Sequence, residues 1–258
     1  MSNYKLVLAN GAFKSGSTWL REIAKCLLDF EFVPPKYASK KRPRWLLQSK
    51  ILDLLGDREY CGIYLSKAHI FEPILVSSLL ARSDVRILNI TRDLRDVLVS
   101  HYYHYSRVRS ANLAFTDYYW SIGRFKAIEV QSYNNVWSAE SDNVFFTAYE
   151  DLKANFASEV TRMADFFGRE ISLDDIEIIA EETSLTRLMK TRNEQGQPES
   201  KRFFRKGVVG DWKNHFSNSE EEDLNNITQN GFDRRIDQLR YHLMFPFRRK
   251  VLGLIKKY

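Results

Sequence analysis

The sequence predicts an α/β protein, a single-domain, three-layer sandwich in which helices cover both faces of a central parallel sheet. Short apolar runs with the composition of buried strands alternate with longer segments of helical periodicity. This alternation is typical of a parallel sheet with crossover helices. The chain also opens with a strand, a glycine-containing loop and a helix. Its 258 residues are enough for one domain with a sizeable core, and no internal repeat or linker divides residues 1–258.

The predicted elements follow from the spacing of apolar residues. Strands are expected at residues 4–9, 62–66, 85–91 and 143–149, where apolar runs have strand length. Helices are expected at residues 17–30, 46–55, 73–82, 93–107, 116–138, 151–167, 173–181, 183–190, 219–229 and 232–242. Residues 33–44 are predicted to be irregular and basic, and residues 191–210 to form a long polar loop. The ligand of such a sheet is expected beyond the carboxyl ends of the strands.

The loop after the first strand carries residue types that bind phosphate. It reads Asn10-Gly11-Ala12-Phe13-Lys14-Ser15-Gly16-Ser17-Thr18-Trp19-Leu20. Its backbone N–H groups and the positive end of the helix dipole would point at an anion. Ser15, Ser17 and Thr18 add hydroxyl donors, and Lys14 adds a mobile charge. The loop departs from the G-x-x-x-x-G-K-S/T pattern of nucleotide kinases, because Ser17 follows Gly16 and the lysine stands two residues earlier. A helix start rich in small residues is the alternative for this segment alone.

Two later segments carry further groups that suit an anion. A β-branched run ends at Arg92, and Ser100 follows about two helical turns later, so both can reach one ligand. An ordinary surface helix with a charged start is the alternative there. Residues 205–216 read RKGVVGDWKNHF. In this second segment Arg205 offers a planar fork, Lys206 offers a point charge, and Gly207 allows a close approach to phosphate.

Together these segments resemble the signatures of the cytosolic sulfotransferases, in that family's order. Residues 13–20 resemble P-K-S/T-G-S/T-S/T-W-L, with Phe13 in place of proline. Residues 92–100 resemble R-N/D/P-x-x-D-x-x-x-S, and residues 205–216 resemble R-K-G-x-x-G-D-W-K-N-H-F at every specified position. Shorter similarities are K-T/S-H at 67–69, with Ala68 in the middle, Y-E-D/E-L/M at 149–152, and T-S-F at 183–185, with Leu185 last. The resemblance spans most of the chain and implies the sulfotransferase fold, which is related to that of the P-loop nucleotide kinases.

The resemblance implies a sulfotransferase that uses 3′-phosphoadenosine 5′-phosphosulfate (PAPS) as donor, releases 3′-phosphoadenosine 5′-phosphate (PAP) and needs no metal. It implies His69 as the general base toward the acceptor, with Lys14 and Lys67 as cations beside the transferring group. The family's 3′-phosphate is held by residues that match Arg92, Ser100 and Arg205. The other donor-binding residues that the resemblance implies are Lys14, Ser15, Gly16, Ser17, Thr18, Trp19, Tyr149, Thr183, Leu185, Lys206 and Gly207.

Two other functions remain open. A small-molecule kinase of related fold would need a lysine at position 17 and magnesium-binding partners, and Ser17 stands there. A non-catalytic protein that binds a nucleotide or a partner is the second alternative. The presence of both Lys14 and His69 argues against it.

Composition bounds the partners and the compartment. A net charge of +6 is too modest to predict a nucleic-acid surface, and it suits an anionic donor. Cys26 and Cys61 lack metal-ligand spacing and are predicted to be reduced thiols. The sequence shows no signal peptide and no run of the about 20 apolar residues that a membrane span needs. A cytoplasmic protein without a membrane span is therefore expected.

The acceptor is expected to be a small molecule, a lipid or a glycan. Residues 32–45, 102–120 and 191–204 are expected to wall its pocket, and their aromatic residues suit an apolar or aromatic alcohol. Arg107, Arg109 and the run Lys40-Lys41-Arg42 instead suit an acidic or glycan acceptor. The basic and apolar tail of residues 245–258 is expected to be flexible. Peripheral contact of this tail with an anionic membrane is the alternative.

The family's dimerisation segment, K-x-x-x-T-V-x-x-x-E, is altered in this chain. Lys213 and Glu222 keep its charged ends, but Ser217 and Asn218 replace its Thr-Val centre. Exposed ion pairs contribute only about 0–1 kcal/mol each. Without the buried valine the contact falls far below the roughly 1,000 Å² of a stable interface. The sequence therefore predicts a monomer, or a dimer that forms through another surface.

Overall fold

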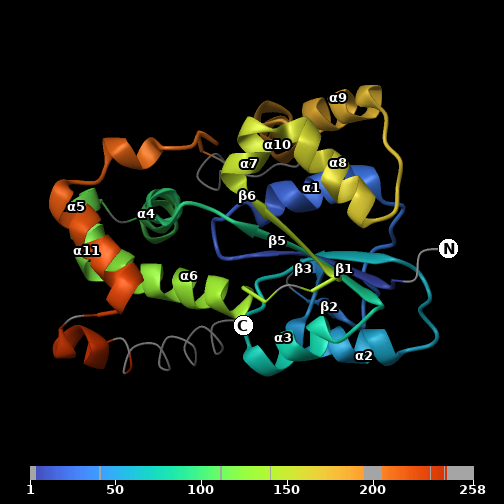
Figure 1. The fold of residues 1–258 in the computed structure, drawn as a ribbon, viewed down its shortest axis with the longest axis horizontal. Coiled ribbons are helices and arrows are strands. Elements are labelled where there is room, and N and C mark those ends of the chain that lie inside the picture. The colour runs from blue at the N-terminus through green and yellow to red at the C-terminus, as the bar shows by residue number, and fades with distance from the viewer. Residues whose placement is uncertain are drawn as a thin grey trace.

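Four parallel strands form the central sheet of the computed structural model, which describes residues 4–40, 42–110, 112–139, 141–194, 205–232, 234–240 and 242. The strand order is β4-β1-β5-β6, and β1, β5 and β6 are labelled in Figure 1. The strands are β1 (Leu6–Gly11), β4 (Tyr64–Lys67), β5 (Val85–Thr91) and β6 (Val144–Ala148). The chain passes from β1 to β4 on one side and then to β5 on the other side. The point where the strand order reverses, at which ligands of such sheets bind, therefore lies beside β1.

Alternate residues of the central strands face opposite layers. Leu6 and Leu8 of β1 belong to one core cluster, whereas Val7 between them belongs to another. In β5, Ile87 faces the first cluster and Leu88 the second. Both faces are apolar because helices cover both, which explains why these strands read as continuous apolar runs.

Helices cover the two faces of the sheet as separate layers (Figure 1). On one face lie α1 (Ser17–Leu27), α7 (Tyr149–Ala154), α8 (Phe156–Phe166), α9 (Leu173–Glu182) and α10 (Leu185–Glu194). On the other face lie α2 (Ile51–Gly56), α3 (Pro73–Leu80) and the hairpin of β2 (Ala38–Ser39) and β3 (Arg42–Leu46). The predicted three-layer α/β sandwich with a central parallel sheet is confirmed.

A third group of helices extends the molecule on the left of Figure 1. It consists of α4 (Leu94–Arg109), α5 (Phe115–Tyr118), the π-helical turn η2 (Tyr119–Gly123), α6 (Arg124–Val136) and α11 (Asn218–Asn230). A short 3₁₀ turn, η4 (Asp211–Asn214), precedes α11. Their own core cluster includes Leu98, Tyr118, Tyr119 and Leu224. Helix α4 therefore runs from the carboxyl end of β5 into a second packed unit.

The predicted irregular segment is wrong in part, and the helix after it begins later than predicted. Ala38–Ser39 and Arg42–Leu46 pair as the antiparallel strands β2 and β3, and Leu46, expected to begin a helix, ends β3. The backbone N–H of Leu46 donates to Ser66 Oγ on β4 at 3.0 Å. This contact with the central sheet is tertiary, so local propensity could not predict it. A 3₁₀ turn, η1 (Gln48–Lys50), follows, and α2 begins only at Ile51.

Two predicted long helices are interrupted. Residues 116–138 are divided by the π-helical turn η2, which inserts an extra residue per turn without ending the apolar spacing. Residues 151–167 are divided at Asn155, whose φ of −133° is not helical. The first piece, α7, also begins earlier, at Tyr149. Periodicity cannot detect these breaks because the apolar face continues across them.

No helix in the described part of the chain has the length and apolar character that a membrane crossing would need. The tail of residues 245–258 and residues 195–204 of the predicted polar loop lie outside the described residues.

Candidate functional site

A cavity of about 350 Å³ lies beyond the carboxyl ends of the sheet strands. Its volume falls within the range of small-molecule sites. Six cationic side chains line it: Lys14, Lys67, Arg92, Lys153, Arg205 and Lys206. No aspartate or glutamate is among the described residues that line it. The cavity therefore presents a strongly positive wall that suits a multiply charged anion.

The loop between β1 and α1 brings the start of a helix to this cavity. Lys14 and Gly16 both have left-handed backbone conformations, with φ of 71° and 108°. A Cβ atom on Gly16 would lie 2.8 Å from Cδ2 of Tyr149, so this position needs glycine. Helix α1 begins directly after it, and Ser17 and Thr18 of its first turn line the cavity. The positive end of the α1 dipole is thus available to an anion.

Lys67 connects the end of β4 to this helix start. Its side chain is buried, with 6% of the residue exposed. Its ammonium donates a hydrogen bond to Thr18 Oγ1 at 2.8 Å and lies 5.3 Å from the centre of the Trp45 ring. A buried cation needs such partners. Lys67 therefore stands at the cavity wall in a fixed position.

Two arginines at the cavity have a buried hydrogen-bond donor without a partner among the described residues. Arg92 packs over the Tyr149 ring at 4.2 Å, and its Nη2 donates to the Val208 carbonyl at 3.0 Å. Arg205 pairs with Asp211 and packs over the Tyr103 ring at 4.4 Å. Nε of Arg92 and Nη1 of Arg205 are buried and have no hydrogen-bond partner among the described residues. A buried donor without a partner costs about 1–3 kcal/mol.

The other end of the cavity is flat and apolar. Trp19 stacks on Phe156, with ring centres 5.9 Å apart and planes inclined by 18°. Tyr149 meets Trp19 edge-on at 5.5 Å. Burial raises the pKa of Tyr149, although Arg92 opposes the shift, so its phenol stays protonated. Thr183 and Leu185 line the same cavity. This end suits an aromatic ring better than a phosphate.

Most of the predicted donor-binding residues, together with the predicted catalytic cation Lys67, meet in this one cavity: Lys14, Gly16, Ser17, Thr18, Trp19, Arg92, Ser100, Tyr149, Thr183, Leu185, Arg205, Lys206 and Gly207. Ser15 does not line it. Because the loop closes a turn from Ala12 to Ser15, the Ser15 side chain lies inside, with 1% of the residue exposed. The sequence led us to expect a Ser15 hydroxyl that faces the cavity, but the side chain is turned into the protein.

The sequence did not predict six residues of the lining: Leu152, Lys153, Phe156, Ala180, Ser184 and Leu188. Lys153 and Phe156 come from α7 and α8, which pack back over α1. The ammonium of Lys153 lies 5.4 Å from the Trp19 ring centre. Nothing in the spacing of these residues indicates that packing. The aromatic Phe156, four residues after the end of the Y-E-D-L segment, was the one available signal.

His69 lies beside the cavity and does not line it. Its Nδ1 is 2.7 Å from the Gly11 carbonyl oxygen. A carbonyl only accepts, so Nδ1 carries the proton, and in the neutral ring the lone pair is on Nε2. The backbone of β1 therefore fixes the tautomer and orientation of this imidazole.

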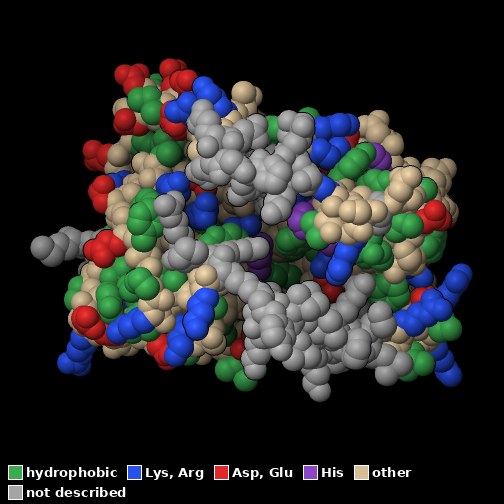
Figure 2. Space-filling view, turned by 180° about the vertical axis from the view of Figure 1, so that it is seen from behind, with side chains coloured by type: hydrophobic (Ala, Val, Ile, Leu, Met, Phe, Trp, Pro, Cys, Tyr) green, Lys and Arg blue, Asp and Glu red, His purple; other side chains and the backbone are tan. Residues whose placement is uncertain are grey.

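Phe13 lies within a cluster of histidines next to the cavity. Its ring centre is 6.1 Å from that of His69, 5.7 Å from His101 and 5.2 Å from His104. Figure 2 shows histidine side chains, with Lys and Arg side chains nearby, around a hollow in one face of the molecule. Burial, and to a lesser extent Lys14 and Arg107, lower the pKa of His104 to about 4. His104 is therefore neutral at physiological pH.

The segments expected to wall an acceptor pocket differ in burial from residue to residue. Phe115, Tyr118 and Tyr119 are buried in the cluster around α4 and α6. Phe32, in contrast, is 60% exposed. Much of the third expected segment, residues 195–204, lies outside the described residues, as does Lys41. Within the described ranges, no group of three or more His, Cys, Asp or Glu residues is arranged to hold a metal ion.

Comparisons with known proteins agree with this geometry. Residues 6–240 match the family described as Sulfotransferase domain. A flavonol sulfotransferase-like protein of Flaveria bidentis is 28% identical over 239 residues, which cover 83% of this chain and 77% of the relative. Sulfotransferase 2A6 of Mus musculus is 26% identical over 234 residues, covering 84% and 80% of the two chains.

Solved structures are similar in fold. A mouse sulfotransferase crystallised with PAP superposes with a TM-score of 0.67 at 20% identity, covering 90% of this chain and 85% of that one. Retinol dehydratase in a complex with retinol and PAP gives a TM-score of 0.61 at 19% identity, covering 91% and 84%.

Proposed function

Because this chain belongs to the sulfotransferase domain family, we propose that it transfers a sulfuryl group from PAPS to a hydroxyl or amine of an acceptor. The observation that carries the proposal is the cavity lined by six cations, with an aromatic end. PAPS carries three anionic groups, namely the sulfate and phosphate on its 5′ side and the 3′-phosphate on its ribose. Its adenine ring lies at the other end of the molecule. The PAP-containing complexes of the structural neighbours support the same choice of nucleotide.

Different residues of the chain bind different parts of the donor. The start of α1, with Lys14, Ser17 and Thr18, binds the 5′ side of the nucleotide. Arg92, Ser100 and Arg205, which line the cavity together, bind the 3′-phosphate. Trp19, Tyr149, Thr183 and Leu185 enclose the adenine, with Lys206 and Gly207 closing the cavity. PAPS supplies the activated sulfuryl group.

His69 acts as the general base. The contact of its Nδ1–H with Gly11 leaves Nε2 as the atom that takes the acceptor's proton. Lys14 and Lys67 stand at the cavity wall and stabilise the negative charge that grows toward the leaving phosphate. Base catalysis of this kind is typically worth about 10²- to 10⁴-fold. Neither a base nor these cations needs a metal ion.

The acceptor is a small-molecule, lipid or glycan alcohol or amine that enters on the side of Phe13. The phenyl ring offers an apolar surface, and the surrounding histidines offer polar contacts. The names of the curated relatives include flavonol and 3-beta-hydroxysteroid sulfotransferases. Phenols and sterols are therefore the first compounds for an acceptor panel, followed by amines, sugars and lipid alcohols. The cytoplasm is the compartment that we propose.

A small-molecule kinase of related fold is the principal alternative. It would hold ATP with magnesium and would need a lysine after Gly16, where Ser17 stands. A thermal-shift comparison separates the two readings. The proposal predicts a larger rise in melting temperature with PAP than with equimolar ATP and magnesium, and turnover unchanged by EDTA. A larger rise with ATP, or activity abolished by EDTA, would favour the kinase.

A further inference from the structure

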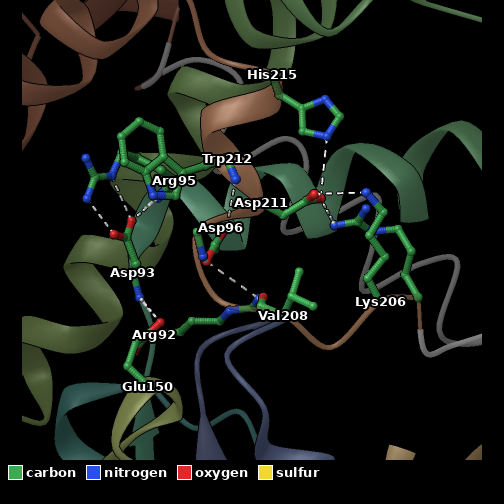
Figure 3. Close-up of polar contacts among 12 residues, drawn as sticks. Arg92, Asp93, Arg95, Asp96, Glu150, Lys206, Val208, Asp211, Trp212 and His215 are labelled. Carbon is green, nitrogen blue, oxygen red and sulfur yellow. Dashed lines mark hydrogen bonds and ion pairs between the residues drawn. The ribbon is translucent and has the colours of Figure 1, made fainter. Parts of the chain in front are cut away.

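Asp96 is a buried carboxylate that does not line the donor cavity. It lies in the first turn of α4, and only 2% of the residue is exposed. Its Oδ2 accepts the backbone N–H of Gly210 at 2.7 Å, and its Oδ1 accepts the N–H of Trp212 at 3.0 Å. Figure 3 shows this carboxylate against the segment that carries Trp212. Both oxygens of Asp96 are therefore used to hold the backbone of a segment more than 110 residues away in sequence.

Arg92, which lies just after β5 and four residues before Asp96, holds the same segment. Its Nη2 donates to the Val208 carbonyl at 3.0 Å and lies 3.8 Å from Asp96 Oδ2. The pair thus offers a donor and two acceptors to backbone groups at alternate residues 208, 210 and 212. Apolar packing contributes little at residues 208 and 209, because Val208 and Val209 are 44% and 48% exposed. Polar contacts with Arg92 and Asp96 hold this part of the segment.

A second carboxylate, that of Asp211, links this backbone segment to two cations of the cavity. Asp211 lies between the two amides that Asp96 binds, and it accepts hydrogen bonds from Arg205 and, at 2.9 Å, from Lys206 Nζ. Burial raises the pKa of Asp211, but the hydrogen bonds from Lys206 and Arg205 outweigh it, and the pKa lies well below its usual range. Asp211 is therefore charged at physiological pH and fixes both cations.

We propose that Asp96 is a positioning residue that docks residues 205–212 on α4, so that Arg205 and Lys206 share one cavity with Arg92. Asp96 touches no ligand in this account. It fixes the backbone at Gly210 and Trp212, and Asp211 between them binds and so positions the two cations. The nucleotide readout below rests on the proposed function, whereas the docking itself does not.

A simpler role is conceivable for an acidic residue at the start of a helix, namely to complement the helix dipole. Asp93 already serves that end, because its side chain accepts the backbone N–H of Arg95. A dipole role for Asp96 would affect the start of α4 and would leave residues 208–216 as they are. The two roles therefore differ in which amides become exposed.

Asp96→Asn tests the docking, because the amide is isosteric but turns an N–H donor toward a backbone N–H. In hydrogen exchange of the full chain without nucleotide, peptides covering residues 208–216 are expected to exchange at least tenfold faster. Those covering β5 are expected to stay unchanged. The control is Asp84→Asn, which removes an ion pair at the opposite end of β5. In that pair Asp84 Oδ2 lies 2.6 Å from Arg82 Nη2. Unchanged exchange at 208–216 in Asp96→Asn, or equal acceleration in the control, would overturn the docking.

Nucleotide binding tests the second half of the proposal. PAP affinity is expected to fall at least tenfold in Asp96→Asn. If Asp96 acts through Arg205, adding Arg205→Ala should cost much less affinity in the Asp96→Asn background than in the wild type. Fully additive losses would show that Asp96 acts elsewhere. Should wild-type protein not bind PAP, the proposed function fails, while the exchange experiment still decides the docking.

An observation on the unaltered chain guards against a variant that does not fold. Residue-resolved exchange should show the amides of Gly210 and Trp212 protected by at least tenfold relative to an unstructured chain. Exchange of both at the unstructured rate would overturn the proposal.

Discussion

Arg92 and Arg205 illustrate what a sequence reveals about single residues. Both were predicted from a short pattern, because an arginine after a strand and an arginine beside a glycine suit an anion. The structure brings both to one cavity. The pattern could not reveal that Asp211 and Asp96 hold these cations in place, because buried carboxylates look like ordinary surface residues in a sequence. Nor could it reveal Lys153, which reaches the cavity only through the packing of α7 on α1.

At this scale we predict that Arg92→Ala and Arg205→Ala weaken PAP much more than adenosine 5′-phosphate. A charge-assisted hydrogen bond contributes about 1.5–3 kcal/mol, so each loss should be roughly tenfold or more. Calorimetric titration of both nucleotides would measure it. Arg169→Ala, which breaks an exposed pair with Asp29, is the control and should change neither affinity. Equal losses for the two nucleotides would refute the 3′-phosphate assignment.

His104 gives a pH dependence at the same scale. Its pKa is about 4 in the folded protein and would be about 6.5 in the unfolded chain. As pH falls from about 6.5 to about 4, the unfolded chain takes up a proton that the folded chain does not, so stability declines. His104→Phe should remove this contribution. Urea unfolding should therefore show that the variant becomes more stable relative to the wild type as the pH falls from about 7 to about 5. A constant difference would mean that His104 does not titrate in this way.

The elements were predictable where the apolar pattern and the packing agree. All four sheet strands were found because both faces of the sheet are buried, which makes each strand a continuous apolar run. The β2–β3 hairpin was missed because it is short, basic and proline-containing, and it depends on a contact between Leu46 and Ser66. The breaks in the long helices were missed because an apolar face continues through η2 and Asn155.

The loop between β1 and α1 gives the prediction at this scale. Gly16→Ala should lower the free energy of unfolding by about 1–3 kcal/mol, since φ is 108° and the new Cβ would lie 2.8 Å from the Tyr149 ring. The matched control is Gly168→Ala, which has φ of 67° but nothing within 4 Å of its Cβ. Chemical denaturation of both variants separates crowding from backbone strain. Equal losses would show that the contact with Tyr149 is unimportant.

The molecule as a whole combines a sheet with the cationic cavity at its carboxyl edge and a group of helices that residues 205–216 contact. Fold class and family were predictable from three well-separated motifs, and the family match over residues 6–240 agrees. The assembly was not predictable with the same force, because an interface depends on exposed side chains. In the structure, Ser217 forms a capping box with Glu220 at the start of α11. The residue that departs from the family's dimer segment thus has a role within the chain.

We predict that the protein does not form the family's usual dimer. Light scattering at micromolar concentration should give the mass of a monomer, 30.4 kDa, or of a dimer that resists Lys213→Ala and Glu222→Ala. The physical reason is the missing Thr-Val centre, since the remaining exposed ion pairs contribute only about 0–1 kcal/mol each. A dimer that dissociates in either variant would contradict this prediction.

The most direct test of the account is sulfated-product formation from PAPS by the wild type and by His69→Ala, each at saturating donor and acceptor. The account predicts PAPS-dependent product with the wild type and a rate below about a tenth of it in the variant, with PAP affinity nearly unchanged. The reason is that Nε2 of His69 acts on the acceptor and not on the nucleotide. A variant that keeps more than about a tenth of the rate would contradict the assignment of the base. A wild-type protein that binds PAP but forms no product from PAPS with any acceptor of the panel would contradict the proposed sulfotransferase activity.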